Sequence, residues 1–254
     1  MVYLNRNVTL NQLKEVVRNN INHKIDYMSD DFNNEQKHAL ELFQKRIFLE
    51  EVIEEAVSFN KKIAWDNSNP NLKLTTTAEE LIEVFKLRSD VYASINYLGE
   101  FKDGIEGLNF DIFDKNSAII FHKTNNQMTG SIRIIFDSKK MLPTEEKFSF
   151  DNERKQYTDI AEVSRLVVKH KSSGLDLGFK YLMAGLHNVF KNNDIKMTLF
   201  GIKKEHYKLY SKLGGVTIIK ELDSYGSINV PFLIVSWDLS LVSKLFKRSF
   251  LNLS

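Results

Sequence analysis

The fold is decided by residues 159–178, DIAEVSRLVVKHKSSGLDLG, where a charged strand runs through a glycine-bearing turn into a helix. Glu162 and Arg165 lie among apolar residues with a period of two, which predicts a strand with one face in a core. The turn that follows supplies lysines and backbone N–H groups at the start of the helix. Unsatisfied N–H groups and a helix dipole of the same direction predict an anion site there.

Composition indicates a packed protein and excludes several classes of function. Of 254 residues 43% are hydrophobic, and the net charge of +2 indicates no general affinity for nucleic acid. The chain has no cysteine, which excludes disulfides and thiolate nucleophiles, and its six histidines are too scattered to predict a metal site. No apolar run approaches the ~20 residues of a membrane-spanning helix, and no signal peptide is recognisable, so we expect a cytoplasmic protein.

Residues 1–70 are expected to form a helical arm. Thr9 and Gln12 begin one helical pattern, and a longer apolar stripe from Ala39 onward predicts a second helix that ends near Trp65. The turn-forming sequence DNSNP, at residues 66–70, is the clearest break in the chain. We expect the arm to pack on the main domain or on a second copy of the chain, which leaves a homodimer through the arm open.

Residues 71–240 are expected to form a mixed α/β core, and residues 241–254 a C-terminal amphipathic, basic helix. Thr77 with Glu80 predicts a capped helix, Gly214 and Gly215 predict the end of another, and residues 141–157 read as a charged connection. The predicted strands lie at residues 72–75, 117–122, 129–136, 160–168, 197–202, 216–221 and 232–239, with helices at 77–92, 175–192 and 204–213.

Four short motifs in one order carry a resemblance. They are Leu87-Arg88 with Tyr92, Asp111 with Asp114, Gly130 to Arg133 followed by Leu142-Pro143-Thr144, and Glu162-Val163-Ser164-Arg165. Each is weak alone, but the ordered set resembles the acyl-homoserine-lactone (autoinducer) synthases and the long-chain N-acyl amino acid synthases of the GNAT superfamily. The resemblance implies an α/β fold with a GNAT-like mixed central sheet flanked by helices.

The resemblance also implies an acyltransferase. The expected reaction moves a fatty acyl group from acyl carrier protein, or from acyl-CoA, to the α-amine of an amino acid or a similar acceptor, with no permanently bound cofactor. The substrate-binding residues implied are Arg88, Tyr92, Asp111, Arg133 and Arg165, and the catalytic ones are Glu162, Asp114, Tyr210 and the backbone near Val167. Asp114 is expected to lie closest to the acceptor amine, Glu162 to accept its proton, and Tyr210 to protonate the thiolate.

The donor is expected to contact Val168 and the turn after it. The candidates are Val168, Lys169, Lys171, Ser173, Gly174 and Gly178. Asp176 departs from the usual phosphate turn and would repel a nucleotide phosphate, which favours carrier-protein phosphopantetheine over free coenzyme A. Leu98 stands where the lactone synthases have tryptophan, which disfavours a lactone product. The lysines around the turn suit an acidic carrier protein, or alternatively form an ordinary solvated face.

Several alternatives remain open from the sequence. Without the resemblance, the six charged motif residues would be interpreted as surface ion pairs contributing ~0–1 kcal/mol each. His206 and His170 are weaker candidates for the acid than Tyr210. A conventional acetyl-CoA-dependent N-acetyltransferase and an inactive GNAT-like acyl-binding regulatory module are the alternative functions. The C-terminal segment either caps the sheet or contacts a membrane or carrier protein.

Overall fold

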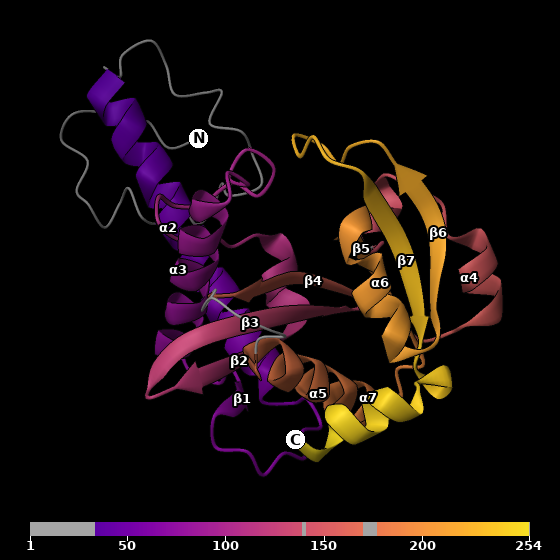
Figure 1. Ribbon diagram of the computed structural model, residues 1–254. Helices are drawn as coiled ribbons and strands as arrows, with labels where there is room; N and C mark the ends of the chain where they lie inside the picture. The colour runs from indigo at the N-terminus through magenta and orange to yellow at the C-terminus, as the bar shows by residue number, and fades with distance from the viewer. Residues whose placement is uncertain (1–33, 139–140, 170–176, 254) are drawn as a thin grey trace.

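The computed structural model describes residues 34–138, 141–169 and 177–253, which form one mixed sheet with helices on both faces (Figure 1). The predicted mixed central sheet is confirmed. Its strand order is β1-β2-β3-β4-β5-β7-β6, with β4 and β5 parallel and every other neighbouring pair antiparallel. The strands are β1 (Leu72–Leu74), β2 (Ser117–Thr124), β3 (Gln127–Phe136), β4 (Ile160–Val168), β5 (Met197–Lys203), β6 (Val216–Leu222) and β7 (Phe232–Asp238).

Each face of the sheet has its own core. Helices α2 (Asn34–Asn60) and α3 (Ala78–Ser94) cover one face, and α5 (Leu177–Asn192) with α7 (Lys244–Ser249) covers the other. Strand β2 shows the alternation that separates them, because Ile119 packs with α3 while its neighbour Ile120 packs with α5. The apolar run of this strand therefore reflects burial on both faces rather than on one.

Two local sequence signals fold as expected. The hydroxyl of Thr77 accepts the N–H of Glu80, whose carboxylate accepts the Thr77 N–H in return, and this capping box begins α3. The β2–β3 hairpin turns through Asn125 and Asn126, whose φ angles of 52° and 61° are ones that asparagine tolerates better than most residues.

Helix α2 ends earlier than its apolar stripe predicts. It stops at Asn60 instead of near Trp65, because the Asn60 amide donates to the carbonyl of Ser117 at 2.9 Å and accepts the Ile119 N–H at 2.9 Å. These bonds fix the chain against β2. The next apolar residues, Ile63 and Trp65, pack in the core on the opposite face, which a continuing helix could not reach.

The remaining segments are short helices and helical turns, of which the sequence analysis predicted only some. The connection at 141–157 contains a 3-10 turn and a short helix, in which Arg154 bonds Glu145 at 2.5 Å and also binds Asp137. The predicted helix at 204–213 is divided into three parts. These segments are η1 (Ile112–Asn116), η2 (Pro143–Glu146), α4 (Asp151–Gln156), η3 (Lys204–His206), α6 (Tyr207–Tyr210), η4 (Ser211–Leu213), η5 (Leu239–Leu241) and η6 (Leu251–Leu253).

Some expectations fall on residues outside the described part of the chain. The first helical pattern after Thr9 and the turn at residues 170–176 are among them. The division of the chain into arm, core and C-terminal helix stays a prediction, as does a homodimer through the arm.

The sheet splits between β4 and β5, and this split positions the site. Only three register pairs join the two strands, from Ile160↔Met197 to Glu162↔Leu199. Beyond Glu162 the strands diverge (Figure 1), and β4 carries an irregularity against β3 where Ser131 faces Val167 but Arg133 faces Ser164. The edge of β4 beyond the third pair therefore faces a cleft instead of a neighbouring strand.

Candidate active site

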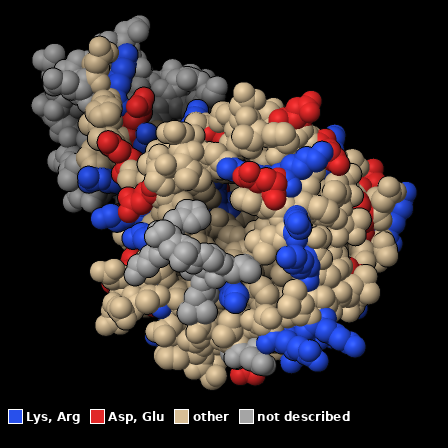
Figure 2. All heavy atoms as spheres, in the orientation of Figure 1, with Lys and Arg blue, Asp and Glu red and all other residues tan. Residues whose placement is uncertain are grey.

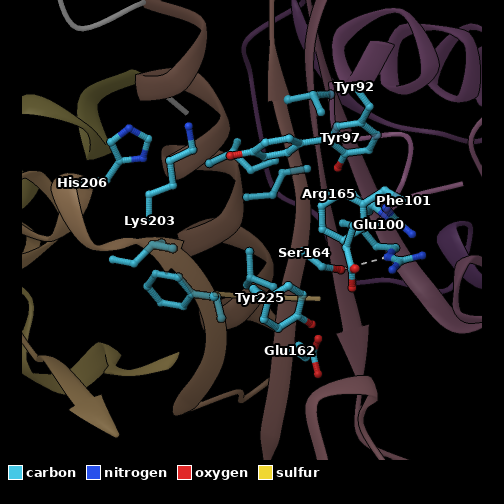
Figure 3. Close-up of a pocket in the computed structure, with 18 of the residues that line it drawn as sticks. Tyr92, Tyr97, Glu100, Phe101, Glu162, Ser164, Arg165, Lys203, His206 and Tyr225 are labelled. Carbon is cyan, nitrogen blue, oxygen red and sulfur yellow. Dashed lines mark hydrogen bonds between the residues drawn. The ribbon is translucent and has the colours of Figure 1, made fainter. Parts of the chain in front are cut away.

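A cleft of about 1270 Å³ occupies the split between β4 and β5. Its two sides differ in chemistry. Toward α5 the wall is apolar, and toward α3 and η1 it is charged and aromatic (Figure 3). The apolar wall includes Phe179, Met183, Leu186, Phe200, Leu209, Tyr210 and Trp237; the other includes Tyr92, Tyr97, Phe101, Asp111, Arg133, Glu162, Ser164, Arg165 and Tyr225.

The motif charges predicted from the sequence form one connected network. Asp111 caps η1 and accepts from Arg133 at 2.6 Å and from Arg165 at 2.8 Å. Asp114, three residues on, accepts from Arg88 at 2.8 Å and lies 3.2 Å from Arg133. The network thus joins α3, η1, β3 and β4, and three guanidinium groups face two carboxylates.

Arg88 and Asp114 form the inner pair of this network, and both side chains are 0% exposed. Neither residue lines the cleft. The Asp114 carboxylate is enclosed by Arg88, Arg133 and the Asp111 N–H, and its expected place closest to the acceptor amine stays a prediction. Arg88 compensates the buried charge of Asp114 and does not itself reach the cleft. Removing one partner of such a buried pair leaves the other charge uncompensated.

Electrostatics keeps the outer pair of the network ionised. Burial alone would raise the pKa of Asp111, but the Arg133 and Arg165 charges hold that pKa well below its ordinary value. Burial would lower the pKa of Arg133, yet the two aspartates raise it. Asp111 and Arg133 both line the cleft, so the network presents a charged surface to a ligand.

Arg165 sits at the irregularity of β4. Its φ of 53° is unusual for a residue with a Cβ and costs of order 1–3 kcal/mol, so the surrounding contacts must hold it. The guanidinium lies 4.5 Å from the ring centroid of Phe101 and 5.6 Å from that of Tyr92, besides its bond to Asp111. Stacking and pairing together orient this side chain at the cleft wall.

Glu162 lies at the last β4–β5 pair, where the cleft begins. Its carboxylate accepts the backbone N–H of Thr144 at 2.8 Å, which explains the use of the Leu142-Pro143-Thr144 motif. Burial raises the pKa of Glu162, although the Thr144 N–H and the Arg133 charge oppose the shift. A carboxylate with a raised pKa beside a cleft suits a general base.

The backbone of β4 beyond the irregularity offers hydrogen-bond donors to the cleft. The N–H of Lys169 donates to the Thr129 carbonyl of β3 at 2.8 Å and is thereby engaged within the sheet. N–H groups alternate in direction along a strand, so the Val168 N–H points to the opposite edge, toward the cleft, and that of Val167 points to β3. The predicted oxyanion-hole position near Val167 stays a prediction, for which the alternation favours the Val168 N–H.

Tyr210 lies in the apolar wall, between Phe179 and Phe200 at centroid distances of 5.9 and 5.4 Å. Burial raises its pKa well above the ordinary value, so the hydroxyl stays protonated. The alternative His206 also lines the cleft; its side chain is 53% exposed, and partial burial lowers its pKa. Gly178 is buried in the first turn of α5, while Lys171, Ser173, Gly174 and His170 lie outside the described residues.

One group of site residues was not predicted. The loop after α3 reaches across the split to the other half of the sheet, and we call residues 97–100 the strap. Tyr97 lies over Lys203 of β5, 5.3 Å from ring centroid to Nζ (Figure 3). Glu100 accepts the N–H of Ser227 at 2.9 Å and pairs with Lys147 at 3.4 Å. These partners are far apart in sequence, so no local pattern could indicate them.

Comparison with known proteins gives a consistent result. The family model described as N-acyl amino acid synthase FeeM matches residues 83–238. The solved structure of FeeM, from uncultured soil microbes, is 18% identical, with a TM-score of 0.54 over 72% of this chain and 95% of that one. A search of curated proteins gave no match.

Two lactone synthases share the fold. The acyl-homoserine-lactone synthase LasI is 16% identical, with a TM-score of 0.50 over 69% of this chain and 92% of its own. The CoA-dependent synthase BjaI, solved with SAM and isopentyl-CoA, is 16% identical, with a TM-score of 0.54 over 69% of this chain and 82% of its own. The four motifs all lie within residues 83–238, the part of the chain that the family model matches.

Proposed function

The chain belongs to the FeeM family of N-acyl amino acid synthases and is an acyltransferase of GNAT-like fold; from this we propose that it joins a fatty acyl group to the α-amine of an amino acid or similar acceptor. The cleft is the observation that carries the proposal. It has an apolar wall for an acyl chain and a charged, aromatic wall for a small polar molecule, and the edge of β4 lies between them.

The donor lies along the edge of β4 with its acyl chain against α5 and α6. Apolar residues of the wall exclude water from the chain, which contributes about 0.8 kcal/mol for each buried methylene. The Val168 N–H, on the cleft side of β4, donates a hydrogen bond to the thioester carbonyl oxygen and polarises that carbonyl. A thioester of acyl carrier protein is the favoured donor, with acyl-CoA as the other source, because Asp176 disfavours a nucleotide.

The acceptor lies on the charged wall. The guanidinium groups of Arg133 and Arg165 line this wall, which suits the carboxylate of an amino acid. With the acceptor carboxylate bound in this way, the acceptor's α-amine lies next to Glu162. The aromatic residues Tyr92, Tyr97 and Phe101 suit an acceptor with an apolar or aromatic side chain.

The reaction follows from these positions. Glu162 accepts a proton from the acceptor ammonium, and the neutral amine attacks the thioester carbonyl carbon. Collapse of the tetrahedral intermediate forms the amide C–N bond and breaks the C–S bond. The second amine proton leaves to solvent, as does the proton held by Glu162. The thiolate takes a proton from Tyr210, whose raised pKa keeps it protonated until then, and Tyr210 regains its proton from solvent.

The direct test is product analysis. Purified protein is incubated with long-chain acyl thioesters of carrier protein or of CoA and a panel of amino acids, and amides are identified by mass spectrometry. We expect long-chain N-acyl amino acids from wild type and from the control Glu106→Gln, which alters an exposed carboxylate, but not from Glu162→Gln. Acetyl-CoA turnover above long-acyl turnover would select the acetyltransferase instead, and absence of any amide would favour an acyl-binding module.

A further inference from the structure

The outer side of the segment from η5 to α7 carries exposed leucines among cations. Leu241 is 63% exposed and Leu245 is 52% exposed, four residues apart along the chain. Lys244, Lys247 and Arg248 are exposed around them. The inner side of the same helix is buried, since Phe246 and Phe250 pack in the core beneath α5. The predicted packing of this helix on the sheet thus explains its buried side but not its exposed side.

The start of α7 is fixed beside the turn that follows α6. The Ser243 N–H donates to the Leu213 carbonyl and its hydroxyl to the Lys212 carbonyl, both at 2.7 Å. Gly214, at a φ of 79°, leaves no room for a Cβ against Ser243 and Leu241, which keeps the two segments in close contact. The cations of α6, η4 and α7 therefore belong to one surface.

We call this surface the α6–α7 face, and it carries one sign of charge. Residues 206–220 and 239–254 contain no Asp or Glu. Lys and Arg side chains gather over α6 and α7 in Figure 2, and the described residues offer none of them an ion-pair partner. Its members are Lys208, Lys212, Leu241, Lys244, Leu245, Lys247 and Arg248.

We propose that the α6–α7 face binds the surface of an anionic lipid bilayer. Cations are attracted to acidic lipid headgroups, and each Lys or Arg near the surface raises the partition coefficient by a factor of about 5. The two protruding leucines favour a bilayer over an acidic protein surface, because only the bilayer offers apolar depth directly beneath its charge. No helix in the described part of the chain has the length and apolar character to cross a membrane.

The face also adjoins the cleft. Leu209 and Tyr210 of α6 line the apolar wall, while Lys208 between Tyr207 and Leu209 is exposed on the outer side. A protein lying on a bilayer through this face would hold its apolar wall near the lipid. The binding itself does not depend on the proposed reaction, so the two proposals fail separately.

The test is sedimentation of the full chain with vesicles of phosphatidylcholine alone and of phosphatidylcholine mixed with phosphatidylglycerol. We expect binding to the mixed vesicles that weakens with added salt. Lys244→Gln with Lys247→Gln and Arg248→Gln should weaken it about 100-fold, and Leu241→Ser with Leu245→Ser about tenfold or more.

Matched controls separate the face from general charge and apolar exposure. Lys45→Gln with Arg46→Gln and Lys86→Gln removes three exposed cations of α2 and α3, and Leu42→Ser removes a leucine that is 40% exposed. Both should bind as wild type. Absence of binding to the mixed vesicles, or equal binding by all variants, would overturn the proposal. Unchanged melting of each variant excludes misfolding as the cause.

Discussion

The charged wall and the apolar wall of the cleft are held in place by different means. The charged wall rests on a few directional bonds, in which Asp111 and Asp114 each bind two arginines and removal of one group leaves another unpaired. The apolar wall is part of the larger core beneath α5, where many small contacts share the stabilisation. We therefore expect substitutions in the charged wall to cause abrupt losses, whereas substitutions in the apolar wall should cause gradual ones.

The largest effect is expected at Glu162, on the border between the walls. Glu162→Gln should lower kcat by about 10²–10⁴-fold, because the amide cannot accept the ammonium proton. Burial raises the pKa of Glu162, so the wild-type rate should fall as pH falls through a pKa above the ordinary carboxylate value. A pH–rate profile measures this limb. If Glu162→Gln keeps both the rate and the acidic limb, another group is the base.

The buried Arg88–Asp114 pair tests the charged wall through the free energy of unfolding. Arg88→Ala should lower the free energy of unfolding by about 3–5 kcal/mol, since it leaves the Asp114 charge buried without its closest partner. Arg88→Met with Asp114→Leu, which removes both charges, should lose much less. Urea denaturation of the single and double variants gives the difference. A single variant as stable as wild type would show that the pair is not what holds η1 to α3.

Substitutions in the apolar wall should change the preferred acyl-chain length gradually. Leu186→Phe, at a buried position lining the cleft, should shift products toward shorter acyl chains, with kcat/KM falling about 4-fold for each methylene that no longer fits. Competition between thioesters of different length, analysed by mass spectrometry, measures the shift. Val189→Leu, buried on the same helix outside the cleft lining, is the control. An equal loss for all chain lengths would mean that Leu186 is not near the chain.

Tyr210→Phe probes a polar group inside the apolar wall. We expect a loss in kcat of about 10–100-fold with little change in stability, because the ring contacts with Phe179 and Phe200 remain. A thioester whose thiol leaves more readily should reduce the loss. If good and poor leaving groups suffer equally, the hydroxyl does not protonate the thiolate.

The smallest effect is expected at the strap. Gly226 has a φ of 57°, and a Cβ there would collide with the Glu100 carboxylate. Gly226→Ala should therefore displace the strap, which belongs to the charged wall. We expect the KM of the acceptor to rise a few-fold while the KM of the donor stays the same. Gly107→Ala is the matched control, because its φ is 78° but a Cβ there meets no atom within 4 Å. Equal effects of both variants would point to backbone strain rather than to the strap.

Much of the fold and part of the site followed from local patterns. The capping box at Thr77, the hairpin turn at Asn125 and the strand around Glu162 were each set by neighbours in the sequence. The charge network followed from the order of the motifs, but the depth of Asp114 did not. Spacing places two carboxylates on one turn and gives no indication of which one the arginines enclose.

Contacts between segments far apart in the chain could not be predicted from the sequence. Glu100 and Ser227 are 127 positions apart, and nothing near either residue marks the bond between them. The end of α2 was misjudged for the same reason, since Asn60 is fixed by β2 and not by its own helix. The apolar wall was not located either, because Leu186 and Trp237 fit the pattern of ordinary core residues.

The short ladder between β4 and β5 has a consequence for how such a protein diverges. Three register pairs and the strap join the halves of the sheet. The residues that we propose for the acyl chain come largely from α5, α6 and β5, and those that we propose for the acceptor come from α3, η1, β3 and β4. Substitutions that share no partner combine additively within a few tenths of a kcal/mol, about 0.3–0.5. Changes in chain length and in acceptor preference can therefore accumulate independently, one half of the sheet at a time.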